Sequence, residues 1–230
     1  MMSRSIRSLA WLASLAVVMA CTATPGASPS AAEPSQAVPS QAAPSQGAPS
    51  GGSAAGSCPS SEPAALPAGE TRSVTIETSK GTITLGLQAD LSPIAVGNFV
   101  ALAECGFYDG VVFHRLVPGF VIQGGDPEGN GGGGPGYAIS DEPLVGTYRR
   151  GTVAMARTPA PDSQGSQFFI ILDDGAESSL TQAEFPYSIL GTVTEGMDVV
   201  DAIAAMPNSG GQTNTALEPV AMDRVTVTTP

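Results

Sequence analysis

Apolar and polar residues alternate in short runs through most of the chain after residue 70. Runs rich in Val, Ile, Thr and Phe, with an apolar side chain at every second position, are typical of strands that bury one face. Glycine and polar residues between the runs indicate turns, and the first two runs flank a hairpin turn at Ser79 to Gly81. The pattern predicts eight strands, at residues 72–78, 81–87, 111–117, 120–125, 151–156, 166–172, 187–193 and 224–229.

Two segments instead have apolar residues at helical spacing. Residues 92–105, SPIAVGNFVALAEC, offer Ser92 as a helix N-cap and Pro93 at the first helical position. Residues 195–206, EGMDVVDAIAAM, predict a second helix. Many short strands with few helices favour a mainly β fold over a layered α/β sheet. We expect a closed antiparallel eight-stranded barrel with two capping helices.

The first 57 residues differ in composition from the rest. Residues 22–57 consist mainly of Ala, Pro, Ser, Gln and Gly with one charged residue, Glu33, and a PSQ-containing repeat of five residues begins at Pro34. Such a segment has too little apolar surface to offset its ordering entropy. We interpret residues 21–57 as a disordered, proline-rich tether and residues 58–230 as one folded domain.

The extreme N-terminus has the features of an export signal. Arg4 and Arg7 precede a run of largely apolar residues that would span about 18 Å as a helix, too short for a bilayer core of about 30 Å. Residues 1–20 therefore predict a signal peptide. The sequence VMAC, ending at Cys21, resembles a bacterial lipobox. This resemblance implies a palmitate-bearing Cys21 and an extracytoplasmic protein anchored to the cell membrane, with a plain secretory peptide as the alternative.

Charge and cysteines narrow the partners and the compartment. The chain has 21 acidic and 9 basic residues, a net charge of -12. We expect no nucleic-acid partner, because binding nucleic acid requires clustered Lys and Arg. Cys58 and Cys105 are the cysteines other than Cys21. In an oxidising compartment they could pair and pin the start of the domain to the end of its first helix, and two free thiols are the alternative.

Two predicted strands mix polar and apolar side chains on one face. Val121 and Gln123 share a face of one strand, and Gln167, Phe169 and Ile171 share a face of another. A glutamine is costly in a dry core, and a phenylalanine gains little on an open surface. These faces favour a sheltered binding groove, although a strand at the boundary of a core has the same mixture.

His114 and Arg115 are neighbours on the predicted strand at residues 111–117. The arginine guanidinium is a planar, permanently charged donor that suits a carbonyl or carboxylate. A lone histidine is more typical of a hydrogen-bonded structural residue than of a general base. Neighbours on a regular strand point to opposite faces, so adjacency does not make the two a catalytic pair.

The glycine-rich segment does not fit a phosphate-binding loop. Gly129, Gly131 and Gly134 match G-x-G-x-x-G, but Pro135 and Gly136 follow where a helix would begin. This arrangement indicates a flexible turn.

The sequence also predicts neither a metal site nor a nucleophilic catalytic residue. One histidine leaves no convincing zinc cluster, and no serine or cysteine lies in a nucleophile motif. Two acidic pairs could bind calcium, but solvated loops explain Asp141 with Glu142 and Asp173 with Asp174. We expect neither a metal nor a cofactor.

Four segments, in this order, resemble the cyclophilin family of peptidyl-prolyl cis/trans isomerases in its bacterial form. They are FHRLVPGFVIQGGDP from residue 113, the glycine-rich loop through GGPGY, GTVAMARTPAPDSQGSQFFI from residue 151 and LGTVTEGMDVVDAI from residue 190. The resemblance spans residues 73–228. It implies a cyclophilin-like barrel and an enzyme that speeds X-Pro rotation in exported proteins and assists their folding. Proline-containing peptides and unfolded exported proteins are then the expected partners of a monomeric enzyme.

The resemblance also implies a set of site residues. The catalytic arginine of the family falls on Arg115, and a hydrogen bond from it to the prolyl nitrogen would favour the twisted amide. A tryptophan common at the rim of the family's pocket has no match, which leaves Leu180 or Phe185 to close the pocket. The implied substrate-binding residues form the proline pocket, flank it with polar groups or lie on the strand whose backbone pairs with substrate. They are Phe120, Val121, Gln123, Ala156, Arg157, Gln167, Phe169 and Tyr187.

Two other functions are compatible with this sequence. A non-catalytic module that binds proline-containing peptides, or a holdase, would use the same fold and pocket. A structural envelope protein is a further alternative, but it would leave the proline pocket without a purpose.

Overall fold

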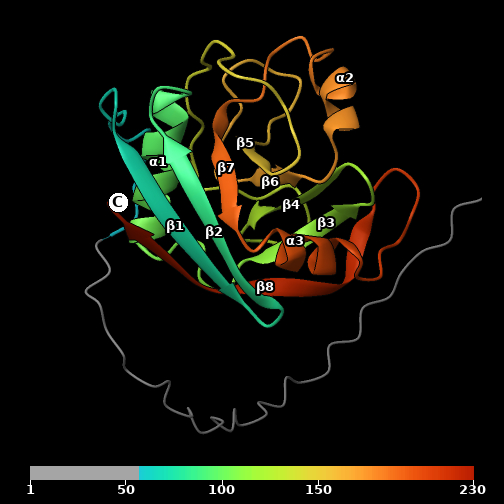
Figure 1. Ribbon diagram of the computed structural model, residues 1–230. Coiled ribbons are helices and arrows are strands. Elements are labelled where there is room, and N and C mark those ends of the chain that lie inside the picture. Colours follow the sequence, from blue (N-terminus) through green and yellow to red (C-terminus); the bar gives the residue numbers. More distant parts are fainter. Residues whose placement is uncertain (1–56) are drawn as a thin grey trace, which may run out of the picture. The chain divides into compact units, whose positions relative to one another are not determined.

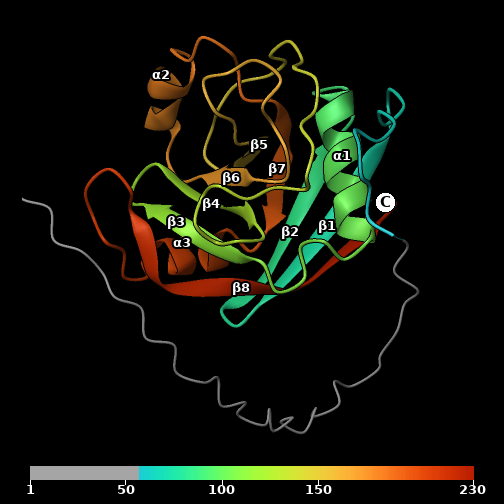
Figure 2. The same ribbon diagram turned by 180° about the vertical axis from the view of Figure 1, so that it is seen from behind.

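The computed structural model describes residues 57–230 (Figures 1 and 2). The expected signal peptide at residues 1–20, lipidated Cys21 and the tether up to residue 56 lie outside these residues and stay predictions. All eight expected strands are present. Their bounds are β1 (Thr71–Thr78), β2 (Gly81–Gln88), β3 (Val112–Val117), β4 (Val121–Asp126), β5 (Thr152–Met155), β6 (Phe168–Ile171), β7 (Ile189–Glu195) and β8 (Thr215–Thr228).

The strands close into one antiparallel barrel. Their order around the barrel is β1-β2-β7-β5-β6-β4-β3-β8, with β8 returning to β1. The expected hairpin joins β1 to β2, where Thr78 pairs with Gly81. The closed barrel confirms the fold class expected from the alternating pattern.

Strand alternation separates two clusters of apolar side chains. Phe168 of β6 belongs to the main core, whereas its neighbour Phe169 belongs to a second cluster on the opposite face of β6. Connections between strands complete the second cluster with Tyr148, Ala176 and Leu180. In Figure 1 these yellow and orange connections lie beside β5 and β6, on the side where α2 also lies.

Both expected helices are present, as α1 (Pro93–Glu104) and α3 (Met197–Ala204). Phe99 of α1 and Ile203 of α3 join the main core. A 3-10 turn (Asp174–Ala176) leads into a four-residue helix, α2 (Glu177–Leu180), which is too short to leave a periodic pattern in the sequence. Among the helices within residues 57–230, none has the length and apolar character needed to cross a membrane.

The N-terminus of α1 is capped by a side chain distant in sequence. Ser92 occupies the N-cap position, but its hydroxyl donates to the Leu91 carbonyl oxygen instead of accepting from the helix. The carboxylate of Glu142 accepts from the N–H groups of Ile94 and Ala95, at 2.8 and 2.9 Å. Burial raises the pKa of Glu142, and these two donors partly offset that effect. The expectation of a solvated loop is therefore wrong for Glu142, which is buried against α1.

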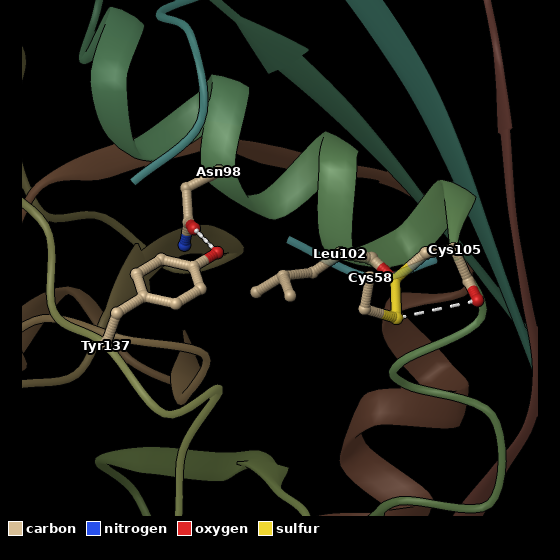
Figure 3. The surroundings of a disulfide bond; sticks show 5 residues. All are labelled: Cys58, Asn98, Leu102, Cys105 and Tyr137. Carbon is tan, nitrogen blue, oxygen red and sulfur yellow. Dashed lines mark hydrogen bonds between the residues drawn. A yellow bond between two sulfur atoms is a disulfide. The ribbon is translucent and has the colours of Figure 1, made fainter. Parts of the chain in front are cut away.

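Residues 58–70, called the strap here, run along α1 from its last turn to its first. A disulfide joins Cys58 to Cys105 at the end of α1, with Cα atoms 5.1 Å apart (Figure 3). At the other end, the N–H of Leu66 donates to the Pro93 carbonyl oxygen at 2.9 Å. Between these points a Cβ on Gly97 would lie 2.5 Å from a main-chain oxygen of the strap, so the two backbones are in direct contact.

Replacing Cys58 and Cys105 together with serine is expected to lower the free energy of unfolding by about 2–3 kcal/mol. The disulfide joins residues 47 positions apart, so its loss returns conformational freedom to the unfolded chain. Urea unfolding of both proteins measures the difference, and limited proteolysis reports whether the strap is released. Equal stabilities would mean that hydrogen bonds and packing alone hold the strap on α1.

Candidate active site

A β-bulge in β3 turns Arg115 away from the main core. Phe113 and Arg115, two residues apart on β3, pair with consecutive residues of β4, so His114 is the extra residue of the bulge. Phe113 and Leu116 both belong to the main core although they are three residues apart. The bulge thereby places Arg115 beside the second cluster, in a pocket formed largely by residues of that cluster.

A chain of side-chain hydrogen bonds runs from Arg115 to the glycine-rich loop. Arg115 donates from Nη1 to Oε1 of Gln123 at 3.2 Å, and Gln123 donates from Nε2 to Oε1 of Gln167 at 2.9 Å. Gln167 in turn donates to the carbonyl oxygens of Gly131 and Gly133, at 3.1 and 2.9 Å. Each amide is thus held in a fixed orientation, and the guanidinium is supported from one side.

Arg115 is a cation without a carboxylate partner. The ion pairs found within residues 57–230 do not include it, and its single side-chain hydrogen bond goes to Gln123. Burial lowers the pKa of Arg115 from its ordinary value, but a guanidinium stays protonated at neutral pH. Its remaining N–H groups are available to a ligand.

A pocket of about 220 Å³, lined by both apolar and polar side chains, lies beside this guanidinium. Val121 and Phe169 are buried in its wall, and the ring of Tyr187 packs edge-on against Phe169 with 5.4 Å between centroids. Leu180, from α2, lines the pocket, whereas Phe185 does not. The pocket brings together the expected catalytic and substrate-binding residues except Gln167, and it adds Leu180. Its lining residues are Arg115, Phe120, Val121, Gln123, Ala156, Arg157, Phe169, Leu180 and Tyr187.

A larger cavity of about 500 Å³ adjoins the pocket and shares Gln123, Ala156 and Arg157 with it. Gln167 lies here, so the expected catalytic and substrate-binding residues all line one or both of these adjoining cavities. The glycine-rich segment at residues 131–137 forms another wall. The N–H of Ala156 donates to the Gln167 carbonyl oxygen at 2.8 Å, which extends the pairing of β5 with β6 into the site.

Asp126, at the end of β4, holds the glycine-rich segment in place. Its carboxylate accepts from the N–H groups of Glu128, Asn130 and Gly131 at 2.8, 3.0 and 2.5 Å. Burial raises the pKa of Asp126, but the backbone donors outweigh burial and hold the pKa below its ordinary value of 3.8. The expected flexible turn is therefore a wall fixed by a carboxylate. Asp126 lies three residues before Gly129, and an aspartate close to a glycine-rich turn is the sequence signal that could have indicated this role.

An Asp126→Asn variant is expected to lose about 2 kcal/mol of unfolding free energy at pH 7, because one charged acceptor serves several N–H groups. The pKa is lower in the folded state, so the ionised carboxylate stabilises the fold above about pH 4 and its contribution is lost as pH falls through the lowered pKa. The difference between native and variant should therefore shrink toward pH 2 in urea unfolding. A difference of the same size at both pH values would contradict the role of the charge.

His114 is buried but differs from the hydrogen-bonded residue that was expected. It is 5% exposed, and neither ring nitrogen has a hydrogen-bond partner among the described residues. Burial lowers the pKa of His114, which favours the neutral ring. It borders a cavity of about 260 Å³ that Arg115 also lines, and it does not line the 220 Å³ pocket.

The described residues hold no group of three or more His, Cys, Asp or Glu side chains that could bind a metal ion. Asp173 and Asp174 are exposed, as expected for a solvated loop. Asp173 accepts from the N–H of Gly175 and so caps the 3-10 turn. Asp141 is instead engaged by Arg157, which corrects the expectation of a solvated loop there.

The family described as "Cyclophilin type peptidyl-prolyl cis-trans isomerase/CLD" matches residues 73–227 of the chain. The chain belongs to the cyclophilins. Peptidyl-prolyl cis-trans isomerase B of Streptomyces anulatus is 40% identical over 174 residues, covering 67% of this cyclophilin and 95% of the relative. Peptidyl-prolyl cis-trans isomerase A of Dickeya dadantii is 37% identical over 164 residues, covering 69% and 85%.

Solved structures agree with this assignment. A Cryptosporidium parvum cyclophilin-type isomerase superposes with a TM-score of 0.60 at 30% identity, over 70% of this cyclophilin and 99% of the solved chain. The same protein in the presence of the dipeptide Ala-Pro gives a TM-score of 0.59 at 30% identity, over 69% and 99%. The barrel and the family are therefore established for this cyclophilin, and the roles of its individual site residues stay predictions.

Proposed function

We propose that this cyclophilin isomerises X-Pro bonds of exported proteins, with Arg115 as the catalytic residue and the 220 Å³ pocket as the proline site. The observation that carries the proposal is the unpaired guanidinium of Arg115 beside the apolar side chains of Val121 and Phe169. A proline ring would fill the apolar part, and the guanidinium would face its nitrogen. The Ala-Pro dipeptide present with the Cryptosporidium protein supports a ligand of this kind.

The chemistry needs a donor but no proton transfer. Rotation about an X-Pro bond is slow because the nitrogen lone pair is delocalised into the carbonyl, and the barrier is about 18–20 kcal/mol. When the bond twists, the lone pair returns to nitrogen and becomes a hydrogen-bond acceptor. Arg115 would donate to it only in that state, so the interaction favours the transition state over either planar state. Gln123 keeps the donor in position.

The N-terminal segment and the disulfide support a proposal for the cellular location of this cyclophilin. Residues 1–20 have the pattern of a signal peptide, and Cys21 follows a lipobox-like sequence. The Cys58–Cys105 disulfide suits an oxidising, extracytoplasmic compartment. We propose that lipid on Cys21 anchors a monomeric enzyme to the cell membrane and that its substrates are proline-containing segments of unfolded exported proteins.

Proline-limited refolding tests the activity. The full-length protein should speed the slow, proline-dependent refolding phase of a reduced model substrate and the cis/trans exchange of an Ala-Pro tetrapeptide. If it binds the peptide and suppresses aggregation without changing either rate, it is a holdase on a cyclophilin fold.

Membrane fractionation tests the anchor. In a bacterium that processes lipoproteins, the native protein should fractionate with membranes and incorporate labelled palmitate, and a Cys21→Ser variant should do neither. Equal labelling of the two proteins, or no labelling of the native one, would reject the lipid anchor while leaving the isomerase proposal intact.

A further inference from the structure

The side chain of Arg157 is enclosed, although the residue borders the substrate site. Its side chain is 3% exposed. Arg157 lines the 220 Å³ proline pocket, the 500 Å³ cavity beside it and a third cavity of about 250 Å³ formed with residues 183–187. Since one residue separates three adjoining cavities, whatever fixes its side chain also fixes their common wall.

The guanidinium of Arg157 is fully used within the protein. Nη1 and Nη2 hold the Asp141 carboxylate in a two-point contact at 2.6 and 2.9 Å. Nη2 also donates to the Ala160 carbonyl oxygen at 2.7 Å, and Nη1 donates to that of Pro186 at 3.3 Å. Nε donates to the Thr158 carbonyl oxygen at 3.3 Å. Every N–H group of this guanidinium therefore has an acceptor, in contrast with Arg115.

Asp141 ties a further loop to the same point. It accepts from the N–H of Asp162 at 2.9 Å and from Nε2 of Gln164 at 3.1 Å. The guanidinium lies over the ring of Phe185, with 4.9 Å between its central carbon and the ring centroid. The cluster thus joins the segments around residues 141, 158–164 and 185–186.

We infer that the Arg157 side chain is a positioning residue for the isomerase reaction. It holds the main chain at residues 156–157, beside which substrate would lie, and the loop that brings Tyr187 against Phe169. A site already in its binding conformation spends less free energy on ordering when substrate binds. Ion pairing with Asp141 also cancels the charge of Arg157, which leaves Arg115 as the unpaired cation of the pocket.

The inference predicts a separation of kinetic constants. It rests on the proposed roles of Arg115 and the proline pocket. A looser wall weakens binding of the planar and the twisted substrate alike, so KM rises while kcat changes little. Loss of the transition-state donor Arg115 would instead lower kcat.

The test uses the full-length protein with Arg157→Lys, Asp141→Asn and both changes together. We expect KM for an Ala-Pro tetrapeptide to rise about 10-fold in each single variant with kcat within about twofold of native, because a looser wall must be ordered when substrate binds. The double variant should be no worse than the worse single variant, since one unit is broken in each case. Main-chain amides at residues 183–188 should exchange with solvent faster in all three. Arg72, on β1, forms an ion pair with Glu70. Arg72→Lys is therefore the matched control, and it should leave KM and kcat unchanged.

The result that overturns the inference is an unchanged KM in variants whose melting temperature falls, because Arg157 then serves stability alone. Additive effects of the two changes would overturn it as well. If Arg157→Lys does not fold, Asp141→Asn decides, since it keeps the arginine. A native protein without activity would reject the proposed function itself, and this outcome is distinct from an active native protein with unaffected variants.

Discussion

An Arg115→Ala variant is expected to lose about 100- to 1,000-fold in kcat/KM for an Ala-Pro tetrapeptide, or roughly 3–4 kcal/mol of transition-state stabilisation. The loss should lie in kcat, because the proline ring would still bind against Val121 and Phe169. Cis/trans exchange measured by NMR over a range of peptide concentrations separates the two constants. Stability should change little, since the arginine side chain makes only the hydrogen bond to Gln123.

Arg115→Lys is the control that separates charge from geometry. Lysine keeps the positive charge but presents a flexible ammonium in place of a planar fork. We expect it to recover only a small part of the lost rate. If both variants keep activity within about threefold of native, no transition-state donor acts at this position, and the rate enhancement would have to come from the pocket alone.

A Gly125→Ala variant is expected to lose about 4 kcal/mol or more of unfolding free energy, enough to leave much of the protein unfolded. Gly125 lies on β4 with a φ of +85°, a backbone conformation that residues with a Cβ rarely adopt. The new Cβ would also lie 2.4 Å from the Ser166 carbonyl oxygen and 3.0 Å from the Phe168 ring. Neither the main chain nor a core ring can move without disturbing the pairing of β4 with β6.

Gly110→Ala provides the matched control for this prediction. Gly110 has nearly the same φ, +81°, but its added Cβ would meet nothing within 4 Å. Backbone strain alone should cost about 1–2 kcal/mol there. Urea unfolding followed by circular dichroism measures the free energy of unfolding of both variants. The difference between their losses gives the cost of the steric contact of the new Cβ with Ser166 and Phe168. Equal losses would show that φ alone makes glycine necessary at residue 125.

The strands and the two long helices follow from the sequence because each leaves a repeating pattern over several residues. The β-bulge at His114 breaks that pattern, and the three-residue spacing of Phe113 and Leu116 is the one trace that it leaves. Without the bulge, regular alternation would turn Arg115 toward the same face as Phe113.

Contacts between distant segments leave no such trace. Glu142 accepts from the N–H of Ile94, 48 residues earlier in the first turn of α1, and Asp141 holds Arg157 across 16 residues. The sequence pattern predicted that both carboxylates are solvated, because adjacent acidic residues between strands usually lie in exposed loops. The substrate-site residues that the resemblance implied are neighbours in the structure, and their roles stay predictions. The resemblance gave Arg157 a main-chain role and did not indicate that its side chain joins three segments.

The strap has a mechanical consequence for a protein held at one end. A pull on the chain before Cys58 reaches Cys105 through a covalent bond, at the last turn of α1. Residues 59–70 are bypassed, so their hydrogen bonds to α1 and its neighbours do not have to bear the load. In the reduced protein the same pull would peel the strap from α1 one contact at a time, starting at residue 58 and proceeding toward Leu66. Rupture forces in a single-molecule experiment should therefore depend on the redox state.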